Sequence, residues 1–221
     1  MNTTNESRLY LVTSSDLGIN LFQGVEEALK AGIGILQYRE KDRRKRSYLE
    51  NAQRLKEMCA EYNTLYIVND NPWAALHVNA DGVHIGQEDI KFSEARKIVV
   101  DKIIGVTCYT IEQALEAQDY GASYIGMHLW NSSNTKPLSE CSSPPIGIEM
   151  FKDICVSVTI PCVAIGGINE SNIEQVLNNG ADYIAMVSGI LCVKDVYSTA
   201  QRMNQIIGDK VNENKRFWLR I

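Results

Sequence analysis

Short apolar runs rich in β-branched residues alternate along the chain with segments of helical periodicity. Continuous apolar runs of four or five residues, bounded by turn-forming residues, are typical of buried parallel strands. The predicted strands cover Leu9–Thr13, Ile35–Tyr38, Leu65–Val68, Gly82–Ile85, Ile103–Thr107, Tyr124–Met127, Cys162–Ile165 and Tyr183–Val187. The pattern therefore predicts eight strands.

Segments with apolar residues three or four positions apart lie between these runs and predict helices. They cover Leu21–Ala31, Ser47–Tyr62, a short stretch opened by Asn71-Pro72, a segment from about Thr110, Ile148–Val156, Asn172–Asn178 and Val196–Ile207. Ser47 and Glu50 have the spacing of a capping box, Thr110 is placed to cap its helix, and Gly180 is placed to end the seventh unit.

Strict alternation of strand and helix predicts parallel strands joined by right-handed crossovers. Either an eight-stranded barrel or an open doubly wound sheet would satisfy the pattern. Similar short segments precede four strands, at residues 31–34, 79–82, 121–124 and 180–183, and this internal echo favours the barrel. We therefore expect a single (β/α)8 TIM barrel over residues 1–221, with a flexible or extending N-terminus at 1–7 and a C-terminal tail at 208–221.

The amino-acid composition limits the kinds of molecule that the protein is expected to bind. The formal net charge of −5 leaves no basic surplus for binding nucleic acid. The polar first seven residues do not resemble a signal peptide, and no run of about 18 apolar residues predicts a membrane span. The six cysteines form no CxxC pair, which favours reduced thiols in a cytoplasmic protein. The apolar tail around Trp218 would pack on the domain or on a partner, so a homo-oligomer is one expectation.

Polar side chains follow the predicted strands where each strand ends, which is the end that carries the chemistry of such barrels. Arg39 and Lys41 follow the second strand, and their cations suit phosphate oxygens. Asp70 and Asp89 follow the third and fourth strands and can point at one ion. Two carboxylates and substrate phosphate oxygens commonly hold Mg2+. The sequence thus predicts a metal-bound pyrophosphate near strands two to four.

A second anion site is predicted after strands seven and eight. Gly166-Gly167 allows backbone N–H groups to approach an anion closely, and Ser188 follows the next strand. The long segment between His128 and Pro145 also suggests a functional loop.

Each of these features has a purely structural interpretation. Asp70 could cap a short helix, and Asp89 could cap the next turn. Gly166-Gly167 could be a tight turn, and residues 39–41 could be a solvated loop with a local ion pair. His84, inside an apolar run, is more often a hydrogen-bonded core residue than a ligand. The functional interpretation depends on all of these residues meeting at one end of the barrel.

Several segments together resemble the thiamine-phosphate synthase family. They are residues 37–41 (QYREK), 68–70 (VND), 81–89 (DGVHIGQED), 135–136 (TK), 164–168 (AIGGI) and 187–188 (VS). The resemblance covers nearly the whole chain in order and at compatible spacing. It implies an Mg2+-dependent transferase that joins a hydroxymethylpyrimidine diphosphate to a thiazole phosphate, giving thiamine phosphate and pyrophosphate.

The resemblance also assigns roles. Asp70 and Asp89 would hold Mg2+, and Gln37 would face the pyrimidine within a binding segment that includes Tyr38 and Glu40. The pyrophosphate would be bound by Arg39, Lys41, Asn69 and Lys136. The thiazole phosphate would be bound by Ser133, Asn134, Thr135, Gly167, Val187 and Ser188. Thr107 stands where the family usually has Ser, and with Arg39, Lys41 and Lys136 it is expected to support catalysis.

One segment departs from the family. Where the family has Gly-Pro-x-Phe-Pro-Thr-x-Thr-Lys, this chain has residues 128–136 (HLWNSSNTK), without the first glycine, the prolines or the phenylalanine. Thiazole tautomerases share the barrel and carry a histidine in this loop, so His128 suggests an alternative as acid–base residue of such an enzyme. A non-catalytic protein that binds thiamine precursors is a further alternative.

Overall fold

The computed structural model describes residues 6–14, 20–130 and 144–213, with side chains as far as residue 210. Its eight strands are all parallel and close into a barrel in the order β1 to β8. The strands are β1 Leu9–Val12, β2 Ile35–Tyr38, β3 Leu65–Asn69, β4 Gly82–Ile85, β5 Ile103–Thr107, β6 Tyr124–His128, β7 Cys162–Ile165 and β8 Tyr183–Met186. Closure pairs Tyr10 of β1 with Ala185 of β8. The predicted barrel is confirmed.

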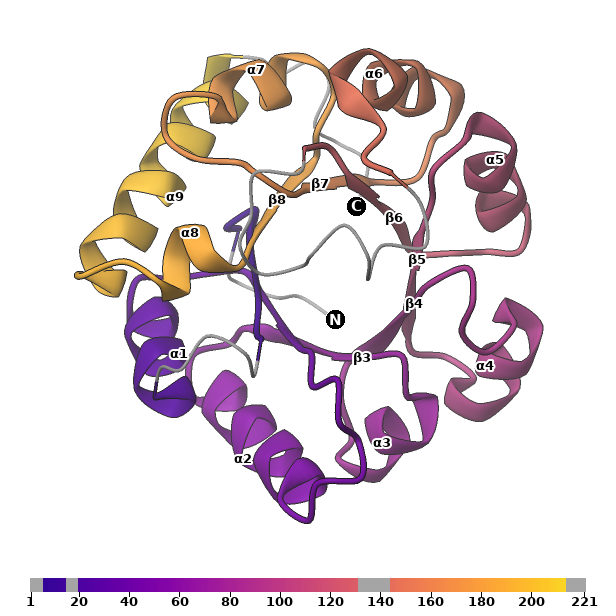
Figure 1. Ribbon diagram of the computed structural model, residues 1–221, viewed down its shortest axis with the longest axis vertical. Coiled ribbons are helices and arrows are strands. Elements are labelled where there is room, and N and C mark those ends of the chain that lie inside the picture. Colours follow the sequence, from indigo (N-terminus) through magenta and orange to yellow (C-terminus); the bar gives the residue numbers. More distant parts are fainter. Residues whose placement is uncertain (1–5, 15–19, 131–143, 214–221) are drawn as a thin grey trace.

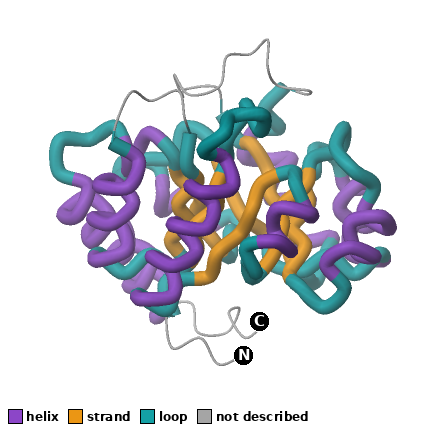
Figure 2. Tube along the Cα trace, turned by 90° about the horizontal axis from the view of Figure 1, so that it is seen from below, coloured by secondary structure: helices purple, strands orange, loops and turns teal. Residues whose placement is uncertain are grey.

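Helices surround the ring of strands (Figures 1 and 2). They are α1 Leu21–Lys30, α2 Tyr48–Glu61, α3 Pro72–His77, α4 Phe92–Val99, α5 Ile111–Asp119, α6 Gly147–Ser157, α7 Ile173–Asn178, α8 Ser188–Leu191 and α9 Val196–Glu213. Within the described part of the chain, no helix is both long and apolar enough to cross a membrane.

Alternation along each strand separates two apolar cores. The larger core lies between the barrel and its helices and includes Leu36, Tyr38 and Tyr66. The smaller core fills the barrel interior and includes Tyr10, Ile67 and Tyr124. Only every second side chain along a strand points into the barrel and can therefore reach a site inside it.

The helix ends differ in part from the predictions. Thr110 caps α5 by accepting a hydrogen bond from Gln113 N at 3.2 Å, as predicted. The capping box at Ser47 is wrong, because Ser47 has helical backbone angles and makes no side-chain capping bond. Asn71, and not Asp70, caps α3 through Ala74 N at 3.0 Å. Asp70 is thus left available for another role.

The two ends of the chain are partly fixed. The Ser7 hydroxyl donates to Asn204 Oδ1 at 2.7 Å, so the last described residues of the predicted flexible N-terminus are tied to α9. Residues 208–213, assigned to the tail, continue α9. The apolar end around Trp218 lies outside the described residues.

Close packing between strands predicts a large effect at Gly82. A Cβ added there would overlap the backbone of Ile103 on β5. Gly82→Ala is therefore expected to lower the free energy of unfolding by about 1–3 kcal/mol in urea denaturation. Gly208→Ala is the matched control, because a Cβ meets nothing within 4 Å on α9. It should stabilise by about 0.5–1 kcal/mol through helix propensity; equal effects of both changes would contradict this packing.

Candidate active site at the carboxyl end of the barrel

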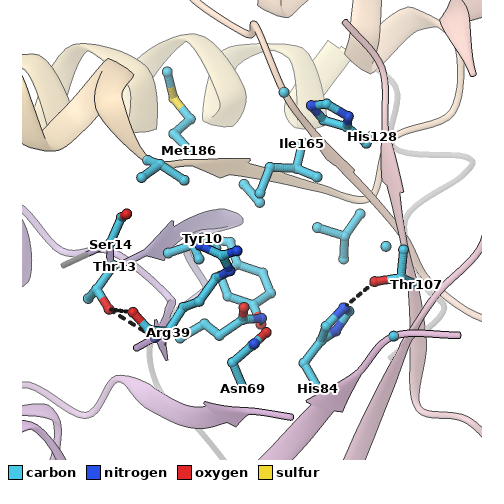
Figure 3. A pocket seen from close by; sticks show the side chains of 18 of the residues that line it. Tyr10, Thr13, Ser14, Arg39, Asn69, His84, Thr107, His128, Ile165 and Met186 are labelled. Atoms are coloured by element: carbon cyan, nitrogen blue, oxygen red, sulfur yellow. Dashed lines mark hydrogen bonds between the residues drawn. The ribbon is translucent and has the colours of Figure 1, made fainter. Parts of the chain in front are cut away.

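A cavity of about 610 Å3 opens at the carboxyl ends of the strands. Figure 3 shows side chains from several strands directed into it, among them Arg39, Asn69, His84 and Thr107. The predicted residues that line it are Gln37, Arg39, Asn69, Asp70, Asp89, Thr107, Gly167, Val187 and Ser188. Residues spread over 152 positions of sequence are thus gathered at one site, as strand-end positions in a barrel predict.

Two carboxyl groups meet at one side of the cavity. Asp70 directly follows β3, and its backbone N donates to His84 O at 2.7 Å. Asp89 lies in the turn after β4, where Asp89 Oδ2 accepts from Gly86 N at 2.8 Å. Burial, and then a hydrogen bond and like-charge repulsion from Asp89, raise the pKa of Asp70 from 3.8 to about 7. The two side chains predicted to share an ion are therefore in contact.

The backbone at Asp70 is constrained as well. Its φ of 60° lies in the left-handed region, which Asp and Asn tolerate better than most residues. Among the described residues, no group of three or more His, Cys, Asp or Glu side chains could hold a metal. A pair of carboxylates with open positions fits an ion that completes its shell with water and ligand oxygens.

Cations lie beside this acidic pair. The Arg39 backbone is held by Thr13, whose Oγ1 accepts from Arg39 N at 2.9 Å (Figure 3). Arg43 and Arg39 both act to lower the pKa of Asp70. Arg43, which the sequence analysis did not single out, also places Nη1 at 3.4 Å from Asp70 O. Positive charge is thus concentrated where a ligand phosphate would meet the carboxylates.

The ends of β7 and β8 form the opposite wall. Gly166 and Gly167 have φ values of 96° and 68°, which glycine adopts without strain. A Cβ at Gly166 would overlap the His128 ring, so glycine is also needed here for space. Val187 and Ser188 line the same wall. The predicted second anion site therefore opens into the same cavity as the acidic pair.

Three predicted substrate-binding side chains do not line the cavity. Tyr38 points outward from the barrel and stacks on Tyr48 of α2 at 5.5 Å between ring centroids, because Gln37 takes the inward position. Glu40 Oε2 forms an ion pair with Lys45 Nζ at 2.9 Å. Glu40 Oε1 accepts a hydrogen bond from Asp42 N at 3.0 Å within the turn after β2. Lys41 is exposed on that turn. These three side chains lie outside the cavity wall, and their direct contact with a ligand stays a prediction.

The remaining predicted residues lie outside the described part of the chain. They are Ser133, Asn134, Thr135 and Lys136. Their roles stay predictions.

Several cavity residues were missed from sequence. Tyr10 and Tyr124 line the cavity from inside the barrel, and Ser14 Oγ is buried there with no hydrogen-bond partner among the described residues. The period-two signal of β1 and β6 could have placed both tyrosines inward. His84 was interpreted as a core histidine; it is buried and hydrogen-bonded, and burial lowers its pKa to about 4.

The chain is similar to known proteins along most of its length. The sequence model described as "Thiamine monophosphate synthase" matches residues 9–190. Thiamine-phosphate synthase of Clostridium acetobutylicum is 40% identical over 211 residues, covering 94% of this chain and 97% of its own. That of Dictyoglomus thermophilum is 44% identical over 202 residues, covering 90% and 89%. The solved structure of thiamine phosphate pyrophosphorylase from Pyrococcus furiosus superposes with a TM-score of 0.82 at 35% identity, covering 94% and 98%.

Proposed function

The chain belongs to the thiamine monophosphate synthase family, and we propose that it joins a hydroxymethylpyrimidine diphosphate to a thiazole phosphate with release of pyrophosphate. Family membership supports an enzyme of thiamine phosphate synthesis. The observation that carries the finer proposal is the contact between Asp70 and Asp89 beside Arg39 in a cavity of about 610 Å3. Drug-sized ligands occupy cavities of such volume.

The acidic pair fits Mg2+. Two carboxyl groups in hydrogen-bonding contact repel each other when both are charged, and a divalent cation removes that repulsion. Asp70 and Asp89 would hold the ion, and water and diphosphate oxygens would complete its shell. When bound, Mg2+ supplies positive charge that stabilises the leaving pyrophosphate.

The residues of the chain would contribute binding, orientation and charge. The bond between the pyrimidine methyl carbon and the diphosphate oxygen breaks, and its electron pair leaves with the pyrophosphate. Arg39 stabilises that developing negative charge, with Arg43 nearby. The thiazole nitrogen then donates its electron pair to the same carbon. Because the cavity fixes both partners, much of the rate gain comes from proximity, and no side-chain nucleophile is needed.

The opposite wall would hold the thiazole phosphate. Gly166 and Gly167 have the positive φ angles that let backbone N–H groups turn toward an anion, and Ser188 adds a hydroxyl to the same wall. The two phosphate groups would thus be bound at opposite sides of one cavity, with the reacting carbon and nitrogen between them.

The position of His128 favours a second candidate function. His128 ends β6, lines the cavity and lies against Gly166, so it is placed to exchange protons with a ligand there. Isomerisation of a thiazole carboxylate that disappears in His128→Asn would support a tautomerase. Unchanged isomerisation in that variant would exclude His128 as its acid–base residue.

The proposed transferase is tested by release of pyrophosphate from the two substrates with and without Mg2+. We expect turnover that requires both substrates and is abolished by a chelator and restored by Mg2+. No turnover at saturating Mg2+ would overturn the proposal. Calorimetry then separates the remaining cases, because binding of both substrates without turnover identifies a non-catalytic binding protein.

A further inference from the structure

Five side chains are joined by consecutive hydrogen bonds that cross the barrel interior. Gln37 Nε2 donates to the Tyr10 hydroxyl at 2.8 Å, and the hydroxyls of Tyr10 and Tyr124 are 2.8 Å apart. The Tyr124 hydroxyl lies 3.0 Å from His84 Nδ1, and His84 Nε2 lies 2.8 Å from Thr107 Oγ1. All five residues line the cavity, and Figure 3 shows the last of these bonds. We call this set the interior chain.

Two glycines make room for the central part of the interior chain. A Cβ at Gly105 of β5 would overlap the Tyr124 ring. A Cβ at Gly126 of β6 would lie 3.1 Å from His84 Cε1. The Tyr124 and His84 rings stack with centroids 5.5 Å apart. The inward positions of two neighbouring strands are therefore kept empty so that these rings can reach their hydrogen-bond partners.

One direction of the interior chain pairs every buried hydroxyl proton, and the reverse direction leaves the Tyr10 proton unpaired. The Gln37 amide nitrogen can only donate, so the Tyr10 oxygen accepts this bond. The Tyr10 proton is then paired within the interior chain only when it is donated to the Tyr124 oxygen. Burial raises the pKa of both phenols, so both keep their protons. In the direction that pairs both phenol protons, the Tyr124 proton is donated to His84 Nδ1.

The direction continues through the imidazole to the cavity. With Nδ1 accepting, the proton of a neutral imidazole is on Nε2 and is donated to Thr107 Oγ1. The Thr107 hydroxyl proton is then left for another acceptor. The Thr107 carbonyl already accepts from Gln87 Nε2 at 2.6 Å. The exposed end of the interior chain is thus a hydroxyl group that donates.

We propose that the interior chain is a positioning device that fixes His84 as the tautomer with its proton on Nε2 and makes Thr107 donate its hydroxyl proton to an acceptor atom of the bound ligand. Tyr10 and Tyr124 act through their neighbours and are positioning residues. The identity of the ligand acceptor, a phosphate oxygen, rests on the proposed function. The tautomer of His84 and the direction of the hydrogen bonds do not rest on the proposed function.

The tautomer is measured by 15N NMR on the ligand-free full chain. The chain has three histidines. The signals that disappear in His77→Gln and in His128→Gln belong to those two residues, and the remaining signals belong to His84. We expect His84 Nδ1 to resonate as an unprotonated acceptor and Nε2 as a protonated nitrogen. A wild-type spectrum with the His84 proton on Nδ1 would mean that the hydrogen bonds of the interior chain run in the opposite direction. It would overturn the proposal, whatever the enzyme's activity.

Tyr124→Phe removes one hydroxyl from the middle of the interior chain. His84 Nδ1 then loses its donor, so its resonance should shift as the two tautomers mix. The value of kcat/KM should fall about 10-fold, because the Thr107 hydroxyl is no longer fixed as a hydrogen-bond donor to the ligand. Unchanged His84 resonances would overturn the proposed hydrogen bond. A lost tautomer preference with unchanged kcat/KM would overturn the positioning role.

Tyr66→Phe is the matched control. Tyr66 is equally buried, but it faces the outer core, and its hydroxyl has no hydrogen-bond partner among the described residues. This change should leave both the His84 resonances and kcat/KM within about 2-fold of wild type. If both phenylalanine variants shift the His84 signals alike, general repacking is the cause and the proposal fails. Absence of transferase turnover in wild type would instead overturn the proposed function and leave the tautomer test intact.

Discussion

Asp70→Asn is expected to stabilise the metal-free protein and to lower turnover about 100-fold or more. In the folded state the pKa of Asp70 is raised to about 7 from 3.8, so folding costs free energy whenever this carboxyl is ionised in the unfolded chain. The folded state holds one more proton than the unfolded state between these two pH values. The free energy of unfolding therefore falls as pH rises through this window.

An amide at position 70 lacks this penalty. It also tolerates the φ of 60°, which alanine would not do without strain. We expect Asp70→Asn to raise the free energy of unfolding by about 1–3 kcal/mol at pH 8 in a chelator, and by much less at pH 4. Chemical denaturation at the two pH values measures the difference.

The same variant should lose activity about 100-fold or more, because one of the two proposed ligands of Mg2+ is gone. Asp119→Asn is the control, since Asp119 is exposed at the end of α5 and does not line the cavity. It should change neither activity nor the pH dependence of stability. If Asp70→Asn destabilises the metal-free protein at pH 8, the assigned cost of burying the Asp70 carboxylate beside Asp89 is wrong.

Arg39→Gln is expected to lower kcat about 100-fold with a small effect on folding. The guanidinium is proposed to stabilise charge on the leaving pyrophosphate, which glutamine cannot do. The contact with Thr13 is made by the backbone N of Arg39 and survives the change. Loss of this cation also allows the pKa of Asp70 to rise further, so more Mg2+ should be needed at neutral pH.

Arg44→Gln controls for loss of positive charge from the same turn. The Arg44 side chain is 95% exposed and pairs with Asp42 at 3.4 Å, and such surface pairs contribute little. Steady-state kinetics should give wild-type kcat for Arg44→Gln. Equal losses in both arginine variants would show that overall charge matters and that Arg39 has no specific role.

The barrel and all eight of its strands could be predicted, because buried parallel strands appear in a sequence as continuous apolar runs. The helix α4 was missed because only Ala95 and Val99 of its eight residues are buried, among several charged neighbours. The helix α8 is four residues long and too short to show a helical period.

The contact between Asp70 and Asp89 followed from their places after neighbouring strands. The interior chain could not be predicted in the same way. Tyr10 and Tyr124 are 114 positions apart and lie on β1 and β6, which are not hydrogen-bonded neighbours. Their meeting depends on the barrel's width and on the empty space at Gly105. The outward position of Tyr38 follows from the inward position of its neighbour Gln37, which the motif alone does not show.

The proposed binding of one divalent ion by Asp70 and Asp89 together, beside a diphosphate, can be measured directly. It is tested most directly by calorimetric titration of Mg2+ into the full chain with inorganic pyrophosphate present, in wild type, Asp70→Asn and Asp89→Asn. We expect one Mg2+ per wild-type chain and at least a 10-fold weaker affinity in each variant. Undiminished Mg2+ binding in both variants would contradict it.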